Sequence, residues 1–366
     1  MKSRAAVKVD IERIEMREFD VPEIGPDSGL LRIESSGVGG SEPEMYRKPN
    51  SAPCIMGHEN VGTITDLGEA AAKRWGLKAG DRVALEEYLP CWHCHWCRQG
   101  DFRLCMEADF FNVKDQFNTL RYGTCNADIP PHLWGGFSQY LYLAPNAVIH
   151  RIPADMNPRH ATLAIPMGNG VQWAVLDGGA GLGKSVVIYG PGQQGLGCAL
   201  AAKSAGARLV IIAGQTRDQA RLDLALQLGA DIAVNVDEQS LKDVVMKHTN
   251  GLGIDVVVDT TGDPTGAIAA EAVDIAAKGA CLNLNGIKGV GVSIGDIKKR
   301  YLTVRAPRGH SYRSVEIALQ IIGSGKWPID QLCSHDFGLD EVHEAVLATA
   351  GRGVAGAIHV TVDPWR

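Results

Sequence analysis

The sequence predicts an α/β protein with two domains, a β-rich domain followed by a doubly wound parallel sheet. The chain has 366 residues, which is too long for a single hydrophobic core, and 45% of them are apolar. Residues 1 to about 165 form short β-like runs broken by Gly and Pro, whereas strand and helix patterns alternate from about residue 167. Glycine accounts for 43 residues, which is typical of the tight turns that α/β enzymes build around nucleotides.

The first part of the chain is predicted to be a compact, mostly antiparallel barrel or sandwich. Its β-like runs include residues 30–35, 62–67 and 81–85. Residues 1–19 interleave charged and apolar side chains, so they lack the continuous apolar core of a signal peptide.

The second part predicts parallel strands joined by helical crossovers, because parallel neighbours cannot be connected by tight turns. We expect strands at 185–189, 208–213, 232–236, 254–259 and 280–285, and helices at 196–205, 218–228, 241–249 and 265–277. Helices at 314–323 and 341–350 then lead to a strand at 357–362, which we expect to return to the first domain. The predicted domains are therefore residues 1–166, 167–305 and a C-terminal return over 306–366.

The net charge, the apolar runs and the cysteine count indicate which partners and which cellular compartment to expect. The net charge is −6, so no global field attracts nucleic acid, and no run of 18 apolar residues predicts a membrane span. The nine cysteines are an odd number in a large chain, which argues against a disulfide framework and for a cytoplasmic protein.

A dinucleotide fingerprint lies between a predicted strand and an Ala-rich helix. Gly190, Gly192 and Gly195 form G-x-G-x-x-G with Gln193 and Gln194 in the loop, a pattern that brings a pyrophosphate to a helix N-terminus. In a glycine-rich chain the same pattern could also mark only a turn.

The end of the second predicted strand favours NADP, although NAD is possible. This strand tip carries no acid to hold the ribose hydroxyls, and Thr216 with Arg217 offers a hydroxyl and a cation instead. Alternatively, Arg217 only begins the next helix and pairs with Asp218. Thr261 and Asn285, at the ends of later strands, complete the predicted cofactor site.

Four cysteines within fifteen residues predict a structural zinc site. Four thiolates close a tetrahedral shell and leave no open position. His93 and His95, between them, are expected to point outward, and redox pairing of the thiols is the alternative. The predicted ligands are Cys91, Cys94, Cys97 and Cys105.

The glycine fingerprint follows these cysteines after about 85 residues. In this arrangement the chain resembles the medium-chain dehydrogenase/reductase superfamily, which contains the zinc-containing alcohol, polyol and threonine dehydrogenases. Gly57-His58-Glu59-Asn60-Val61-Gly62 is similar to the family's catalytic-domain signature, and Gly80-Asp81-Arg82-Val83 to the turn before its metal loop. The resemblance implies a GroES-like barrel with a zinc lobe at about 88–108, a Rossmann domain, an active site in the cleft, and a homodimer or homotetramer.

The sequence departs from the family where the catalytic zinc would bind. Relatives use a Cys in Gly-x-Cys-Gly-Ser/Thr-Asp, the His of Gly-His-Glu, and a later Cys, Glu or Asp. Here Gly39 replaces the first ligand and Ile165 the last, so His58 and Glu59 remain. A catalytic zinc normally needs three protein ligands, which predicts that this zinc is absent and that the chain holds one structural zinc. The carboxylate of Glu44 could still supply a third ligand.

Without that metal, a side chain must handle the proton of the substrate oxygen. His58 is the predicted acid/base because its pKa lies near neutrality. Ser41 corresponds to the hydroxyl that relatives place on the substrate oxygen, and Glu44 occupies the place of a relay His. Alternatively, His58 is a satisfied polar group and Ser41 a turn residue.

These features predict an NAD(P)-dependent oxidoreductase acting on a small alcohol or carbonyl substrate, such as a secondary alcohol, polyol or sugar derivative. The alternatives are a zinc-independent reductase of conjugated C=C or C=N bonds and an inactive NADP-binding protein. Large aromatic side chains could line an apolar pocket or serve as packing, namely Trp92, Trp96, Phe110, Phe111, Trp134 and Trp173.

Overall fold

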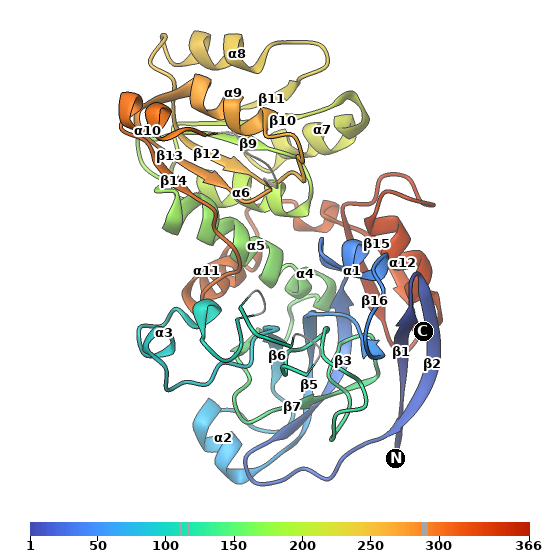
Figure 1. Cartoon of the computed structure of the whole chain (residues 1–366). Coiled ribbons are helices and arrows are strands. Elements are labelled where there is room, and N and C mark those ends of the chain that lie inside the picture. The colour runs from blue at the N-terminus through green and yellow to red at the C-terminus, as the bar shows by residue number, and fades with distance from the viewer. Residues whose placement is uncertain (110–111, 116–117, 287–291) are drawn as a thin grey trace. The chain divides into compact units, whose positions relative to one another are not determined.

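The computed structural model describes residues 1–109, 112–115, 118–286 and 292–366, and it divides into two compact units (Figure 1). The first unit contains residues 1–165 and 332–366, and the second contains residues 166–331. In the part of the chain that is described, no helix combines the length and apolar character needed to cross a bilayer.

A seven-stranded sheet forms the centre of the first unit. Strand β7 (Tyr140–Leu143) pairs with β3, and the other six follow the order β15 (Cys333–Gly338), β16 (His359–Asp363), β3 (Gly29–Gly37), β5 (Glu59–Leu67), β6 (Arg82–Leu85) and β8 (Ile149–Arg151). All pairs are antiparallel except β15 with β16, as the glycine-broken runs predict. The C-terminal strand β16 pairs with β3, so the end of the chain completes this sheet.

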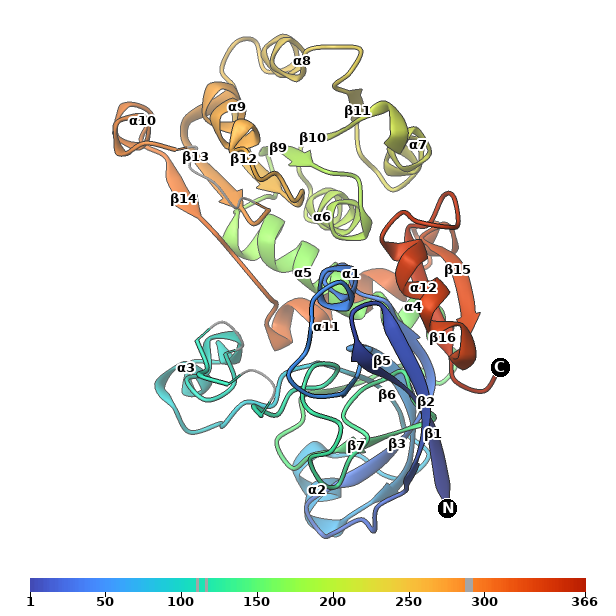
Figure 2. The ribbon, with the colours of Figure 1, turned by 45° about the vertical axis from the view of Figure 1, so that its right-hand side comes forward.

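A second sheet has three strands and contains the N-terminal part of the chain. Its order is β2 (Arg13–Asp20), β1 (Lys2–Asp10) and β4 (Cys54–Ile55). The short helices of this unit are α1 (Glu42–Tyr46), α2 (Glu69–Trp75), α3 (His95–Arg98), α4 (Pro158–Thr162) and α12 (Val342–Thr349), with 3-10 turns at Phe102–Leu104 and Leu339–Glu341. One apolar core joins Val38 and Phe137 to Val346 and Val362 of the C-terminal segment, which anchors that segment in the unit. Figure 2 shows helix α12 and strand β16 of this segment in red.

The second unit is a six-stranded parallel sheet. Its order is β11 (Ile232–Asn235), β10 (Leu209–Gly214), β9 (Ser185–Tyr189), β12 (Ile254–Asp259), β13 (Ala276–Leu284) and β14 (Thr303–Arg305). Numbered along the chain, this is the 3-2-1-4-5-6 order of a doubly wound dinucleotide-binding sheet, so the predicted α/β class is confirmed. The order reverses between β9 and β12, and ligands bind such sheets beyond the carboxyl ends of the strands at that point.

Among the described residues, five helices connect these strands, namely α6 (Gln193–Ser204), α7 (Gln219–Gln227), α8 (Leu241–His248), α9 (Ala267–Ile275) and α10 (Ile294–Arg300), and α11 (Tyr312–Ile322) follows the last strand. The sequence predicts α6 to α9 and α11, whereas it predicts neither α10 nor β14. Short 3-10 turns lie at Thr216–Asp218 and Ile329–Gln331. Helix α9 is shorter than expected, because strand β13 already begins at Ala276. Helix α5 (Ala164–Gly170) leads into a π-helix at Val171–Asp177.

The chain re-enters the first unit at Leu332, whereas the expected return began at residue 306. The physical reason is the packing of α11, which contacts α6 and the π-helix of the second unit. Trp173 and Trp134 are each 2% exposed and serve as packing, whereas Trp92 and Trp96 are exposed. Phe110 and Phe111 lie outside the described residues.

Candidate active site and cofactor site

Gly39 precedes helix α1, at the position where the family's zinc thiolate is expected. A β-carbon built on Gly39 would lie 2.7 Å from Nε2 of His58 and 2.7 Å from Oε2 of Glu42. These contacts are shorter than a carbon atom tolerates, so any larger residue at position 39 must displace the two side chains. The imidazole and the carboxylate thus occupy the space that a cysteine would need.

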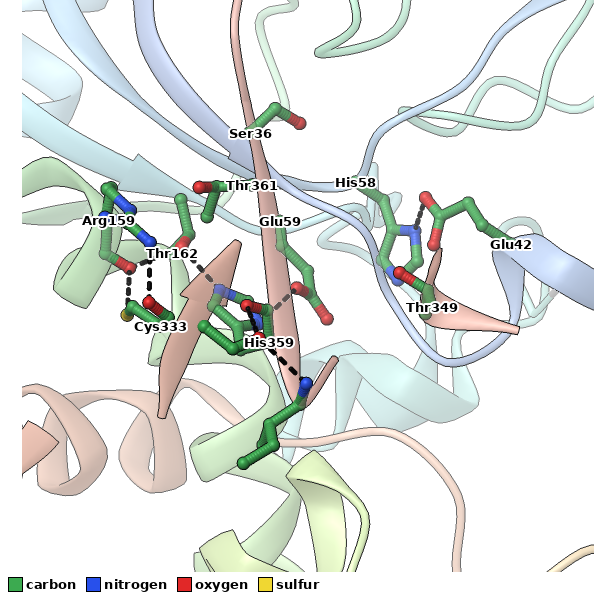
Figure 3. Close-up of polar contacts among 12 residues, drawn as sticks. Ser36, Glu42, His58, Glu59, Arg159, Thr162, Cys333, Thr349, His359 and Thr361 are labelled. Carbon is green, nitrogen blue, oxygen red and sulfur yellow. Dashed lines mark hydrogen bonds and ion pairs between the residues drawn. The ribbon is translucent and has the colours of Figure 1, made fainter. Parts of the chain in front are cut away.

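His58 forms a buried hydrogen-bonded pair with Glu42 (Figure 3). Nδ1 of His58 lies 2.7 Å from Oε1 of Glu42, whose side chain is fully buried, while 14% of the His58 side chain is exposed. Among the described residues, no group donates to the second oxygen of Glu42, which is the oxygen beside Gly39. The hydrogen bond fixes the ring, so that Nε2 remains for other chemistry.

The electrostatics of the pair favour the charged imidazolium. Burial on its own lowers the pKa of His58, but the charge of Glu42, its hydrogen bond, and the more distant charges of Glu87 and Glu59 together raise that pKa to about 9. The ring therefore carries a proton at neutral pH.

Glu59, at the start of β5, lies on the other side of this site and is 2% exposed. Burial is the main cause that raises the pKa of Glu59 to about 8, so its carboxyl group is protonated near neutral pH. Its Oε2 lies 3.8 Å from Nδ1 of His359, and Nε2 of His359 is 2.8 Å from the Thr162 hydroxyl (Figure 3). Burial, with a smaller effect from the Arg159 charge, lowers the pKa of His359 to about 3, so this ring is neutral.

The structure does not place Ser41 and Glu44 with His58 and Glu59. Ser41 is exposed at the N-cap of α1, and Glu44 forms an exposed ion pair with Lys48 at 2.7 Å. The residue that faces His58 is Glu42, which our sequence analysis did not select. Its signal was available, because Glu42 follows Ser41 at the acidic position of the family segment.

The residues around His58 do not form a metal site of three ligands. In the described ranges, three or more His, Cys, Asp or Glu donor atoms gather within 4.8 Å of one another only in the cysteine lobe. Glu44 forms a surface ion pair with Lys48, and Ile165 is apolar and 3% exposed. The absence of a catalytic zinc stays a prediction, which rests on the missing donors at Gly39 and Ile165.

The four lobe cysteines do fit a metal. Their sulfurs lie within 4.8 Å of one another, and the backbone N–H groups of Cys91 and Cys94 donate to the sulfurs of Cys105 and Cys91, each at 3.3 Å. Such N–H donors stabilise thiolates, and those from Cys97 and Met106 lower the pKa of Cys94 to about 6. His93 points outward, as expected, to the exposed Glu107.

The glycine fingerprint has the geometry of a phosphate loop. Gly190 directly follows β9 and has a φ of +90°, which favours glycine, and a β-carbon on Gly195 would lie 1.8 Å from the Gly190 carbonyl oxygen. A β-carbon built on Gly192 would meet no other protein atom within 4 Å, so a ligand can approach the backbone of Gly192. Helix α6 begins at Gln193, with Gln194 next to it, and its first N–H groups can face a phosphate.

A cavity of about 750 Å³ lies at the carboxyl ends of β9, β10 and β12. Gly190 and Gly192 of the glycine loop line it with Thr261 and Arg217, and Arg221 brings a second guanidinium. The other predicted residues of the loop, Gln193, Gln194 and Gly195, are not among the lining residues. Thr216 and Asn285 are not among the lining residues: the Thr216 hydroxyl bonds to Asn235 on β11, and Asn285 directly follows β13. Arg221 lies 3.5 Å from Asp218, whereas Arg217 is exposed.

Comparisons with known proteins identify the family of both units. The alcohol dehydrogenase GroES-like domain matches residues 25–154, and the zinc-binding dehydrogenase domain matches residues 195–322. A Mycobacterium tuberculosis protein named "Probable alcohol dehydrogenase adh" is 35% identical, over 99% of this chain and 98% of its own. The L-threonine 3-dehydrogenase of Pyrococcus furiosus is 30% identical over 92% of each chain.

The fold agrees with these matches. The crystal structure of an alcohol dehydrogenase from Thermotoga maritima superposes with a TM-score of 0.87 at 24% identity, over 99% of both chains. The predicted resemblance is therefore confirmed, and with it the GroES-like and Rossmann assignments. The chain belongs to the zinc-type medium-chain dehydrogenase/reductase superfamily, a family of NAD(P)-dependent alcohol dehydrogenase-like oxidoreductases.

Proposed function

We propose that this protein is an NADP-dependent oxidoreductase that interconverts a small alcohol and its carbonyl compound without a catalytic zinc. The names of the relatives support alcohol substrates. The proposed substrate is a secondary alcohol, a polyol or a sugar derivative. The observation that carries the proposal is the His58–Glu42 pair, which fills the space beside Gly39.

In this proposal, His58 performs the proton transfer that a zinc-bound site would assist. The bound nicotinamide cofactor supplies or accepts the hydride. During carbonyl reduction, Nε2 of the His58 imidazolium donates a proton to the oxygen that becomes the alcohol, and during oxidation the neutral ring accepts it. Glu42 holds the ring through Nδ1 and stabilises its charge, so the proton donor is ready at neutral pH.

The nucleotide site supports NADP as the preferred cofactor. Arg217 and Arg221 both line the cavity, and the strand tip between Gly214 and Thr216 carries Gln215 instead of an acid. A guanidinium binds a 2′-phosphate with paired hydrogen bonds, whereas a carboxylate would repel it.

The cysteine lobe would hold one structural zinc through Cys91, Cys94, Cys97 and Cys105. A zinc with four thiolates has no open position, so it stabilises the lobe and takes no part in proton transfer. The odd cysteine count further supports a cytoplasmic protein, and family membership supports a homodimer or homotetramer.

A second function is favoured by the same observation, that glycine stands at position 39 where relatives carry a zinc-binding cysteine. Reduction of a conjugated C=C or C=N bond needs a hydride and a proton donor but no Lewis acid, and His58 can supply that proton. A screen of NADPH oxidation with ketones, each paired with the corresponding enone, separates the two functions. Turnover of ketones supports the first, turnover of enones alone supports the second, and binding of NADPH without any turnover would leave an inactive nucleotide-binding protein.

A further inference from the structure

The cysteine lobe around helix α3 contains a second set of metal-ligating groups beside its four thiols (Figure 1). Cys91, His93 and Glu107 each offer one ligand atom, and these three atoms lie within 4.8 Å of one another. Nε2 of His93 is 3.1 Å from Oε1 of Glu107, and the two side chains are 68% and 60% exposed. Thiolate, imidazole and carboxylate are all groups that bind zinc in proteins. We call these three residues the outer set and the four cysteines the inner set.

The outer set lies on the side from which solvent reaches the inner set. Cys105 is fully buried and Cys97 is 5% exposed, whereas Cys91 and Cys94 are only partly buried. A cation that arrives from solvent therefore meets Cys91 or Cys94 before it meets the two deeper sulfurs. Cys91 belongs to both sets, so its sulfur connects the exposed ligands to the buried ones.

The distances within both sets suit a tetrahedral zinc. Two sulfurs that each lie about 2.3 Å from zinc are about 3.8 Å apart, and Sγ of Cys91 lies 4.0 Å from Sγ of Cys97. A nitrogen and an oxygen bound at about 2.0 to 2.2 Å are about 3.3 to 3.5 Å apart, so the 3.1 Å between His93 and Glu107 needs to open only slightly. The outer set supplies three protein ligands and leaves a position for water, whereas the inner set is closed.

We propose that Cys91, His93 and Glu107 form an outer site that binds zinc on its way to the four cysteines. A shell of four thiolates is saturated, so an ion that enters or leaves needs other ligands while the sulfurs bind or release it. Cys91 can keep one bond to the ion throughout. Bonds to the His93 nitrogen and the Glu107 oxygen break as bonds to the other three sulfurs form, each thiol that binds passes its proton to water, and the oxidation state of the zinc does not change.

Isotope exchange on the purified, zinc-containing full chain tests the outer site, because uptake and release follow the same path in opposite directions. The protein is incubated with excess Zn²⁺ enriched in a heavier stable isotope and freed of unbound metal, and its isotope ratio is followed by mass spectrometry. His93→Ala should slow the exchange by about tenfold or more, because the outer set then keeps only two ligands. Glu107→Gln should slow it as well, since an amide carries no charge to attract the cation.

His95→Ala is the matched control. His95 is also exposed and follows Cys94 directly, but in the part of the chain that is described it belongs to neither set. This variant should therefore exchange zinc at the rate of the wild type. Elemental analysis of all three variants should still return one zinc per chain, because the inner set is intact in each of them.

The outcomes separate this inference from the proposals on which it stands. Exchange at the wild-type rate in His93→Ala and Glu107→Gln would overturn the outer site. Equal slowing in His95→Ala would overturn it too, because the effect would then be a general one on the lobe, and so would loss of the resting zinc in His93→Ala. A wild-type protein purified without zinc would refute the proposed structural zinc and this inference together. The proposed proton transfer by His58 is independent of all four results.

Discussion

Nδ1 of His58 lies 2.7 Å from Oε1 of Glu42, and the β-carbon that Gly39 lacks would lie 2.7 Å from the other nitrogen and the other oxygen of this pair. Glycine at position 39 therefore leaves room for the His58–Glu42 pair as it stands. A larger residue at this position would have to displace both side chains.

Replacing His58 by Asn should lower kcat by about 100- to 10,000-fold, because the reaction loses its proton donor. Affinity for NADP should hardly change, since the nucleotide cavity is lined by residues of the other unit. Steady-state kinetics and calorimetric titration measure the two effects. His248→Asn, on an exposed helix end, is the matched control and should behave like the wild type.

Two glutamates on helix α1 should behave differently. In Glu42→Gln the His58 ring loses the charge that raises its pKa to about 9, so its pKa should fall to about 6.5 or below. Carbonyl reduction at pH 8 should then drop by about ten- to thirtyfold. The pH profile of kcat measures the change.

In Glu44→Gln the same profile should keep its position, because Glu44 bonds to Lys48 at the surface. Equal shifts in the two variants would contradict the assignment of Glu42 as the partner of His58.

Arg217→Ser should weaken NADP binding by about ten- to a hundredfold and leave NAD binding nearly unchanged, because only NADP carries the 2′-phosphate. Dissociation constants for both cofactors, measured by fluorescence titration, check this. A parallel loss for NAD and NADP would show that Arg217 supports the fold of the strand tip instead of binding phosphate.

Glu59 should make the protein less stable as the pH rises. Its pKa in the folded state is about 8, compared with about 4.5 when exposed, so the folded state binds the extra proton. The free energy of unfolding should therefore fall between about pH 4.5 and pH 8 and remain low above that range. Glu59→Gln, which mimics the protonated acid, should remove much of this slope and stabilise the protein at pH 9 by a few kcal/mol. Denaturant unfolding at pH 5 and pH 9 measures the difference, and a variant that is destabilised equally at both would refute it.

The parallel sheet could be predicted because short stretches of sequence identify its strands and its glycine loop. The strand Ile254–Asp259 and the loop from Gly190 to Gly195 are recognisable from a few neighbouring residues. The strands Lys2–Asp10 and Cys333–Gly338 were not predicted as strands, because each carries several polar residues and is defined by pairing with a distant partner. The local pattern of polar and apolar residues does not specify which distant strand such a segment pairs with.

The candidate site was predicted in part for a similar reason. His58 lies in a recognisable signature, but its partner depends on how helix α1 begins. Glu42 and Glu44 are two residues apart and so point to different sides of that helix: one is buried against His58, and the other reaches solvent and Lys48. The composition of the segment does not reveal which of the two faces inward.

The zinc content of the purified, active protein tests the central claim most directly. Elemental analysis should return one zinc per chain, which is lost in Cys97→Ser and retained in His58→Asn. Two zinc ions per chain in the active protein, with one of them lost in His58→Asn, would contradict the account and make His58 a metal ligand.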